Sequence, residues 1–556
     1  MKSRTSFFNG TVFKKDVTRF FPLWALYLIG GCLVMLTATM RSDPGMAART
    51  VGRSLYILPI VNLVYAPLAA MLLFGDLHKS RMCNALHALP IRREGWFFSH
   101  VAAGLSFSIV PNLVGVLLLL PRLGEFWYVG FLWLLAMTLQ YLFYFGVAVL
   151  AIMVSGNRTA SWAIYGILNF GSQLVYWFLA SVYLPSLYGI VIPQEPFHLL
   201  CPTEILVGDD KLLRFEYVSR TNGIEGWQFL GLGENWSYLV WIAVIGTLFL
   251  GLALLLYRKR HLETAGDFIA WKPIQPVFSV GYTLCFGAML SVVGAMLDDV
   301  LLVFLVIGLT VGWFTGQMLL KRTVRVFQLP VILKGAAIVI VMVISIFATQ
   351  ADIFGVVRYV PQKEQVTQVT IIDTYSYDGG EVTLVCKEKE DIQTVLSLHQ
   401  TILKHKEKAG NYASGHYRNS LKLIYTLNDG TQLTREYDFT IPKEDGQALR
   451  TLLSRPEAVL GEALTGQWTL VECEGYEVSA ELYDSLRQAI LADCQEGNMA
   501  QDRIFHSGQE TYIHIRYTVE SGNIGYKKGK TVRVYGDSQH TLAWVKANFQ
   551  VGESVK

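Results

Sequence analysis

Charged residues are scarce in this sequence. Only 16% of its 556 residues are Asp, Glu, Lys or Arg, whereas 52% are hydrophobic, and the mean hydropathy is positive. Soluble domains average about 25% charged residues, so the composition argues against a string of soluble domains and indicates a membrane protein. The formal net charge of +3 is close to zero, and it gives no reason to expect a nucleic-acid partner.

Cysteine is also scarce, and the usual catalytic motifs are missing. The seven cysteines form no CxxC pair, which excludes a zinc ribbon, a thioredoxin-type centre and a dense disulfide framework. The sequence contains no HExxH, no GxSxG and no GxGxxG after a predicted strand, so it offers neither a zinc-protease site nor a hydrolase or dinucleotide site. We therefore expect no catalytic residues, no metal site and no enzymatic activity in this chain.

Two weaker signals favour ordinary structural roles. The segment GYKKGKT at 525–531 has three residues between its glycines, whereas a Walker A loop has four and leads into a helix. It leads into a strand here, so we predict a basic hairpin turn. His399 and His405 are six residues apart on a predicted helix, so they do not share a face as metal ligands would. We expect both to lie on the surface.

Long apolar stretches dominate the first 350 residues. Crossing a bilayer takes roughly 20 residues, and nine stretches qualify, at about 20–40, 55–75, 97–120, 126–154, 159–182, 236–257, 277–297, 300–320 and 331–350. The first has the basic flank of a signal peptide, but its apolar run is too long and no cleavage site follows, so we expect it to be retained. Asp298 and Asp299 separate the seventh and eighth stretches, and we expect them to be solvated in an external turn.

The distribution of positive charge predicts the orientation, because Lys and Arg resist translocation. With the N-terminus inside, the cytoplasmic segments hold 17 Lys and Arg residues against 7 in the external loops before residue 351. Nine spans then place the C-terminal region outside the cell. Residues 1–350 hold 25 basic and 16 acidic residues, and 351–556 hold 22 and 28, so a basic membrane part precedes an acidic tail. Within the segment 183–235 we expect short helices that rest on the outer leaflet or dip between the spans.

The tail changes from long apolar runs to alternating and amphipathic patterns. A predicted hairpin surrounds Asn428, Asp429 and Gly430, residue types that accept the positive φ of a tight turn. A similar order of strands and helices returns roughly a hundred residues later, where Ile515, Arg516 and Tyr517 echo Leu423, Ile424 and Tyr425. The predicted fold is thus a polytopic α-helical membrane protein of about nine spans, followed by an extracytoplasmic α+β domain that is duplicated, with lobes at 351–466 and 467–556.

The most informative segment lies between the second and third spans. It reads GDLHKSRMCNALHALPIRREGWFFSH, residues 75–100, and Met82, Leu86 and Leu89 can share one helical face before Pro90 ends the helix. One interpretation is a basic loop that lies on the membrane and satisfies the positive-inside rule. Arg258, Lys259 and Arg260, after the sixth span, have two interpretations, contact with a partner protein or anchoring of that span to anionic lipid, and we expect the anchoring.

The segment also resembles a known element. ALHALPIRRE is similar to the coupling helix of ABC transporter permeases of the type-2 exporter family, which ends in a Leu-x-x-Leu-Pro-hydrophobic-Arg pattern. The positions that carry this resemblance are Leu86, Leu89, Pro90, Ile91, Arg92 and Arg93, with Asp76 where an acidic residue often precedes the helix. Asp76 replaces the more usual Glu, and His100 stands where a basic residue often opens the third span.

Other segments resemble the same family. FFNGTVFKKDVTRFFPLW, 7–24, looks like its amphipathic N-terminal interface helix, with one face toward lipid and one toward headgroups. The apolar positions are Phe13, Val17, Phe20 and Phe21, and the basic positions are Lys14, Lys15 and Arg19. Residues 1–258 match the family's six-span layout, and 259–350 match the three additional spans of bacterial permeases that carry a large external C-terminal domain.

The resemblance implies a function. Such a permease exports its substrate across the bacterial cell membrane, pairs with a second permease copy or a related permease, and is energised by a dimer of a separate ATPase subunit. It binds no cofactor itself, because ATP and Mg²⁺ belong to the ATPase. The alternative is a polytopic sensor or scaffold whose external domain binds a ligand or a cell-envelope component. A sensor would not need the coupling-like segment, which therefore discriminates between the two interpretations.

Overall fold

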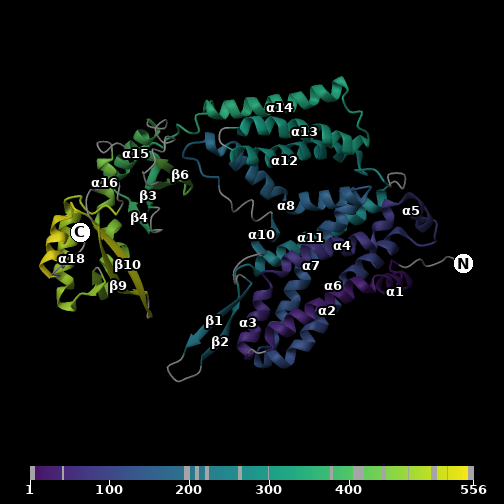
Figure 1. Ribbon diagram of the computed structural model, residues 1–556, viewed down its shortest axis with the longest axis horizontal. Helices are drawn as coiled ribbons and strands as arrows, with labels where there is room; N and C mark the ends of the chain where they lie inside the picture. The colour runs from purple at the N-terminus through teal and green to yellow at the C-terminus, as the bar shows by residue number, and fades with distance from the viewer. Residues whose placement is uncertain are drawn as a thin grey trace. The chain divides into compact units, whose positions relative to one another are not determined.

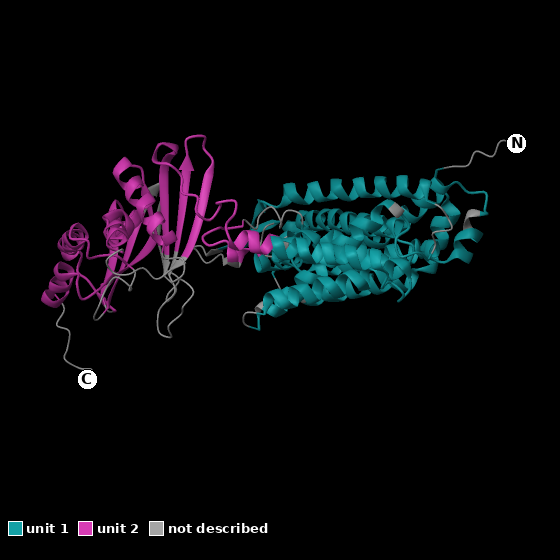
Figure 2. Ribbon diagram, turned by 90° about the horizontal axis from the view of Figure 1, so that it is seen from above, with its two compact units in different colours: residues 1–182, 193–344 teal, residues 183–192, 345–556 magenta. Residues whose placement is uncertain are grey.

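The computed structural model describes most of the chain. The described residues are 7–40, 43–192, 201–206, 212–219, 225–260, 266–297, 300–375, 380–404, 419–439, 446–473, 475–501, 510–521 and 524–548. They form two compact units, residues 1–182 with 193–344, and residues 183–192 with 345–556 (Figure 2). Asp298, Asp299 and His405 lie outside the described residues, so the expectations for them stay predictions.

The first unit is a bundle of helices (Figure 1). Its longer helices are α1 (Gly10–Arg19), α2 (Phe21–Thr39), α3 (Pro44–Ser54), α4 (Leu58–Leu73), α6 (Arg93–Leu123), α7 (Trp127–Val154), α8 (Arg158–Val182), α11 (Trp236–Lys259), α12 (Gln275–Ala295), α13 (Leu301–Lys321) and α14 (Leu329–Gln350). The short η1 (Gly75–His78) and α5 (Ser80–His87) lie between α4 and α6. Each of the nine predicted apolar stretches coincides with one of these helices.

Several of these helices are long and apolar enough to cross a membrane. Six helical ranges of the described residues qualify, or eight if two bent pairs, α1 with α2 and α3 with α4, each count as one span. One of the six, Arg93–Val154, holds both α6 and α7. These two run antiparallel, because Gly104 lies against Phe145 and Gly130 against Val116. The chain is therefore mostly helical with several candidate spans, and the count of nine stays a prediction.

Close approach of two helices organises the centre of this unit. A Cβ added to Gly146 of α7 would collide with the backbone of Gly246 in α11, and one added to Gly246 would collide with the backbone of Phe143. Small residues at such crossings let helix backbones touch, which is the usual source of packing energy between helices in a bilayer. Gly146 and Gly246 therefore hold α7 and α11 together, and most of α7 from Gln140 to Val154 is buried.

The segment 183–235 contains more than the short helices that the sequence indicates. Short helices are present at Leu184–Ser186 (η3) and Pro202–Leu206 (α10). The structure adds an antiparallel hairpin, β1 (Leu213–Ser219) and β2 (Glu225–Leu232), which we did not predict. The Arg49 guanidinium of α3 lies 3.5 Å from the ring centroid of Trp227, a cation–π contact that fixes the hairpin to α3.

The second unit contains two four-stranded antiparallel sheets with the same strand order. In the first lobe the order is β4-β3-β5-β6, and in the second it is β8-β7-β9-β10. The first lobe comprises β3 (Val366–Tyr375), β4 (Gly380–Cys386), α15 (Lys389–Lys404), β5 (Asn419–Leu427), β6 (Gln432–Phe439), α16 (Gln447–Leu453) and α17 (Pro456–Leu460). The second comprises β7 (Gln467–Cys473), β8 (Tyr476–Glu477), α18 (Tyr483–Gln495), β9 (Thr511–Ser521), β10 (Ile524–Val534) and α19 (Gln539–Asn548).

The equivalence of the lobes extends to single positions. Tyr425 on β5 pairs with Val369, and Tyr517 on β9 pairs with Trp468, so both tyrosines occupy the same place in their sheets. The hairpin predicted around Asn428 is confirmed, because β5 and β6 pair across it and Gly430 has a φ of +81°.

Two expectations for this unit are wrong. GYKKGKT is not a turn: Gly525 to Thr531 lie within β10 and pair with β9 along their whole length. Strand β10 lies at the edge of its sheet, and Lys528 is exposed there, as suits an edge strand. His399 is not a surface residue either, since it is completely buried. Its Nε2 lies 2.5 Å from the hydroxyl of Tyr437, and its Nδ1 lies 2.9 Å from that of Tyr425, which satisfies both ring nitrogens.

Candidate functional site

The segment that resembles a coupling helix forms a helical protrusion between α4 and α6. It begins with η1, continues as α5 from Ser80 to His87, and turns through 88–92 before α6 starts at Arg93. Helix α5 ends earlier than Pro90, so Leu89 lies in the turn and not on the helical face that the spacing predicts. The amide of Ile91 donates to the carbonyl of Leu89 at 2.7 Å, which closes this turn tightly.

The protrusion presents apolar side chains to its surroundings. Met82 is 41% exposed and Leu89 is 47% exposed, whereas Cys83 is buried. Pro90 and Arg92 are also exposed, and Ile91 and Arg93 are half-buried. The side chain of Leu86 lies outside what the structure describes. Singly exposed apolar side chains are common on protein surfaces, so this exposure is compatible with a partner surface but does not identify one.

A buried arginine anchors the beginning of the protrusion. Arg260, just after α11, is only 5% exposed. Its guanidinium donates to the carbonyls of Ile152 at 2.9 Å, Met153 at 3.3 Å and Leu77 at 3.5 Å. The first two carbonyls belong to the last turn of α7, where a cation complements the helix dipole. Arg260 thus joins η1 to the ends of α7 and α11, and the prediction that it anchors lipid is wrong.

A second arginine anchors the end of the protrusion. Arg93, the first residue of α6, donates to the carbonyls of Tyr257 at 3.3 Å, Arg258 at 3.0 Å and Arg260 at 3.0 Å. These carbonyls terminate α11, so Arg93 satisfies acceptors that a helix end leaves without partners. Beside it, Nε of Arg258 lies 2.9 Å from a carboxylate oxygen of Glu94. The protrusion is therefore bonded at both of its ends to the ends of longer helices.

A histidine links the same segment to α8. Nε2 of His78 in η1 lies 3.3 Å from the hydroxyl of Ser161, which in turn lies 2.5 Å from that of Ser155. Burial, together with the charges of Arg260 and Arg158, lowers the pKa of His78 to about 4. His78 is therefore neutral near pH 7, when it can share a hydrogen bond with Ser161 without adding a third positive charge to the cluster.

The N-terminal helix α1 is tied to this region as well. Asn9 caps it by accepting from the amides of Thr11 and Val12, the usual role of Asn at a helix start. Nδ1 of His100 lies 2.6 Å from Oδ2 of Asp16. The charged groups of Arg19 and Asp76 lie 3.8 Å apart. The two residues that depart from the family pattern, Asp76 and His100, thus each contact α1.

The apolar residues of α1 face protein as well as the surroundings. Phe13, Val17 and Phe20 are half-buried and pack against the core of the first unit, whereas Phe21 is 53% exposed. Lys14, Lys15 and Arg19 are exposed, as expected for a face toward headgroups. Phe13, Val17 and Phe20 thus pack partly on protein, and it stays a prediction that their remaining exposed surface is turned to lipid.

One group of side chains in the second unit has the spacing of a metal site. Among the described residues, Asp493, Glu496 and His540 place one possible ligand atom each within 4.8 Å of the others. The carboxylate of Asp493 already accepts from the amides of His540 and Thr541 and from the hydroxyl of Thr541. These bonds cap the start of α19 and explain why Asp493 is buried there, so we assign no metal to this group.

Comparisons with known proteins do not assign the chain. No family model, no curated protein and no solved structure matches it. The site therefore rests on its own geometry.

The sequence indicates the protrusion and α1, and the structure brings Asp76 together with Arg19. The sequence does not reveal the buried hydrogen bonds of Arg260, His78 and Asp16, because these residue types are common on surfaces.

Proposed function

We propose that this chain is the membrane-spanning permease subunit of an ABC exporter, in which a separate ATPase drives the movement of the helices through the segment 75–93. The proposal starts from the resemblance of this segment to a coupling helix. One observation carries it further: the segment exposes Met82 and Leu89 at its tip, and Arg260 and Arg93 bond its two ends to the ends of α7 and α11.

This arrangement can transmit a mechanical force from α5 to the long helices α6, α7 and α11. A force on α5 would reach α7 and α11 through the three carbonyls that Arg260 holds, and would reach α6 directly along the chain. Because the hydrogen bonds of Arg260 are buried, they are not weakened by competing water. Binding and hydrolysis of ATP by the partner would then shift the permease between two helix arrangements, which is how a nucleotide biases a two-state element.

Orientation and assembly belong to the same proposal. The N-terminus and the segment 75–93 would lie in the cytoplasm, as the distribution of Lys and Arg predicts, and the C-terminal unit would lie outside the bacterial cell membrane. Two permease chains, identical or related, would pair with two ATPase subunits. The ATPase pair would supply the bound ATP and Mg²⁺.

The test is isolation of the complex from its native membrane. The tagged full-length chain is purified in mild detergent, and its partners are identified by mass spectrometry, for the unmodified chain and for Leu86→Asp/Leu89→Asp. A stoichiometric ATP-binding protein that is lost from the double variant supports the proposal. Thr11→Asp/Thr18→Asp is the matched control, because it also adds two negative charges, here at exposed positions of α1, and should retain the partner. Recovery of the chain alone, or equal retention by both double variants, contradicts the proposal.

A sensor or scaffold is the second candidate, and one observation favours it. The segment 183–192, which directly follows α8 in the chain, adds to the edge of the first-lobe sheet: Ile190 bridges to Arg435, and the amide of Glu436 donates to the carbonyl of Gly189 at 3.0 Å. A ligand bound to this lobe would thereby change the conformational equilibrium of α8, which the segment 183–192 directly follows. The co-purification experiment separates the two candidates, because a sensor without transport needs no ATPase.

A further inference from the structure

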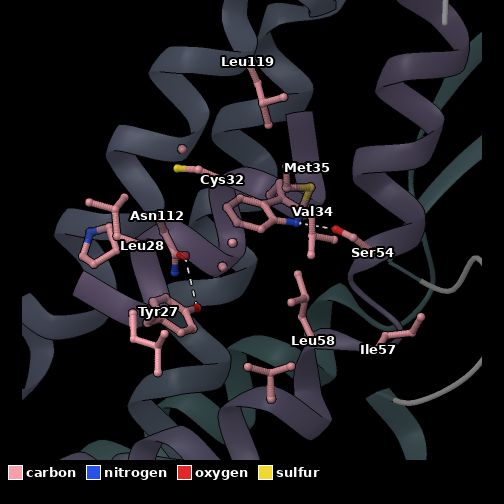
Figure 3. Close-up of a pocket in the computed structure, with 17 residues that line it drawn as sticks. Tyr27, Leu28, Cys32, Val34, Met35, Ser54, Ile57, Leu58, Asn112 and Leu119 are labelled. Atoms are coloured by element: carbon pink, nitrogen blue, oxygen red, sulfur yellow. Dashed lines mark hydrogen bonds between the residues drawn. The ribbon is translucent and has the colours of Figure 1, made fainter. Parts of the chain in front are cut away.

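The first unit contains a cavity that the proposed coupling role does not use. It has a volume of about 450 Å³ and lies between α2, α4, α6 and α7 (Figure 3). Small-molecule sites usually measure about 300–1,000 Å³, so the cavity is large enough for a ligand. All four helices are apolar and belong to ranges that are long enough to cross a membrane, α2 and α4 as parts of the two bent pairs.

The few polar atoms in the wall already have partners in the wall. The hydroxyl of Tyr27 donates to Oδ1 of Asn112 at 3.1 Å, and Nε1 of Trp133 donates to Oγ of Ser54 at 2.8 Å. Figure 3 shows the first of these pairs at one side of the cavity and Ser54 at the other. Since these groups satisfy one another, an occupant does not need to offer hydrogen bonds, and the remaining surface favours an apolar one.

Glycine creates the space. Gly30 and Gly31 lie in the middle of α2 and Gly115 lies on α6, and all three line the cavity. A Cβ at Gly30 or Gly31 would meet no atom within 4 Å, and one at Gly115 would meet only the sulfur of Cys32 at 3.9 Å. These glycines therefore do not serve close helix packing, unlike Gly146 and Gly246. Glycine inside a helix costs about 0.5–1 kcal/mol relative to alanine, and here the structure gains only open space in return.

The cavity opens toward the side of the helices. Of its lining residues, Leu26 is 72% exposed, Val34 is 66% exposed and Ile57 is 67% exposed. In a spanning helix, such side chains face lipid and not water. A void of this size that lacks atoms forfeits dispersion contacts along its whole wall, and the molecules available at its mouth are hydrocarbon chains.

We infer that this cavity binds one hydrocarbon chain of a membrane lipid, which enters sideways between α2 and α4. The inference does not depend on the ATPase, because it concerns only the first unit and its surrounding bilayer. Its requirement is specific: the space beside Gly30, Gly31 and Gly115 must stay open. A larger side chain at these positions would fill the space of the hydrocarbon chain. Its Cβ would meet no protein atom at Gly30 or Gly31, and only the sulfur of Cys32 at Gly115.

The test uses the full-length chain in nanodiscs that contain phosphatidylglycerol with a photoactivatable diazirine near the middle of one acyl chain. After irradiation, mass spectrometry measures the label on the peptide that holds Pro111–Leu119 of α6, for the unmodified chain, Gly31→Leu and Gly115→Leu. Gly251→Leu is the matched control, since Gly251 is exposed on α11, also has open space around its Cβ, and does not line the cavity. Retention of phospholipid by the chain purified in detergent is the second measurement.

We expect strong labelling of this peptide in the unmodified chain and in Gly251→Leu. Labelling should fall by roughly tenfold in Gly31→Leu, the loss of affinity expected when two CH₂ groups of the lipid chain are no longer buried. The amount of retained phospholipid should fall as well. Gly115→Leu fills the space from the opposite wall and should act alike, which guards against a folding defect specific to one variant. Equal labelling in all variants would overturn the inference. So would absence of label together with a cross-link between two copies at Ile57, since a second protein chain would then cover the opening.

Discussion

Nδ1 of His100 lies 2.6 Å from Oδ2 of Asp16, although 84 residues separate them in the chain. His100 belongs to α6 and Asp16 to α1, and both side chains are largely buried, with 13% and 9% of their surface exposed. The pair therefore fixes the N-terminal helix to the first turns of α6. A surface ion pair would contribute little, whereas a shielded one is costly to break from one side only.

This contact predicts a measurable coupling between the two residues. Asp16→Ala and His100→Ala should each lower the thermal unfolding midpoint of the chain in detergent, and the double variant should lower it by much less than the sum. We expect a coupling free energy of about 1.5–3 kcal/mol, the range for a hydrogen bond to a charged group. Lys15→Ala, on the exposed face of α1, should not couple to His100→Ala. Strict additivity for Asp16 and His100 would contradict the contact.

Replacing Arg260 should lower the free energy of unfolding far more than replacing its neighbour Arg258. Arg260→Met leaves the carbonyls of Ile152, Met153 and Leu77 without their donor, which we expect to cost about 3 kcal/mol. Arg258→Met removes an ion pair whose arginine is 55% exposed, and its effect should be below about 1 kcal/mol. Unfolding midpoints of both purified variants provide the measurement. Equal effects would show that Arg260 is not the anchor of η1.

The sequence predicts the helices of the first unit well, for a physical reason. A stretch of twenty apolar residues has few stable arrangements other than a helix, so α8, α11 and α14 follow from composition alone. The hairpin of β1 and β2 does not follow in this way. Its strands are short, and its position depends on the contact of Trp227 with Arg49 of α3, a residue more than 170 positions earlier in the chain.

The candidate site is predictable only in part. The order of residues around Leu89 and Pro90 indicates the protrusion, because proline and its neighbours act locally. The role of Arg260 is not local: its position beside Arg258 and Lys259 is typical of a lipid anchor, and only the fold turns its side chain inward to α7. The burial of His399 is not local either. Its partners Tyr425 and Tyr437 come from two strands whose pairing the spacing of histidines does not reveal.

Buried His399 predicts that the first lobe loses stability in mild acid. Burial, and then the charge of Arg435, lowers the pKa of His399 to about 4, below the usual value near 6.5. The unfolded state therefore binds a proton first as the pH falls, and stability decreases between about pH 6.5 and pH 4. The loss is on the order of 3 kcal/mol at the acid end. Above pH 6.5 the contribution of His399 is complete.

Hydrogen exchange of the full-length chain can measure this effect. Amides of β5 and β6 should exchange faster at pH 5 than at pH 7.5 after correction for the intrinsic rate. His399→Phe should remove most of this difference, because phenylalanine cannot take up a proton. His514→Gln is the control, since His514 is exposed on β9 of the other lobe and should leave the difference intact. An unchanged pH dependence in His399→Phe would contradict the assignment.

Gly189 should control whether the segment 183–192 stays on the first lobe. It has a φ of +78°, and a Cβ there would collide with the ring of Tyr437. Gly189→Ala therefore combines backbone strain with a clash, and we expect exchange of amides in 183–192 to rise by about tenfold or more. Gly355→Ala separates the two causes, because Gly355 also has a positive φ, +66°, but has no atom near its missing Cβ. Equal effects on the segment would show that the ring contact is unimportant.

The central claim is that the tip of the segment 75–93 contacts an ATPase in the cytoplasm. The most direct measurement places a photoreactive amino acid at Leu89 and, in a separate variant, at Ile353, which is also an exposed apolar residue but is predicted to lie outside the cell. Irradiation of intact cells should join position 89, and not position 353, to a protein that binds ATP. Position 89 joined only to lipid, or both positions joined to proteins of the cell exterior, would contradict the claim.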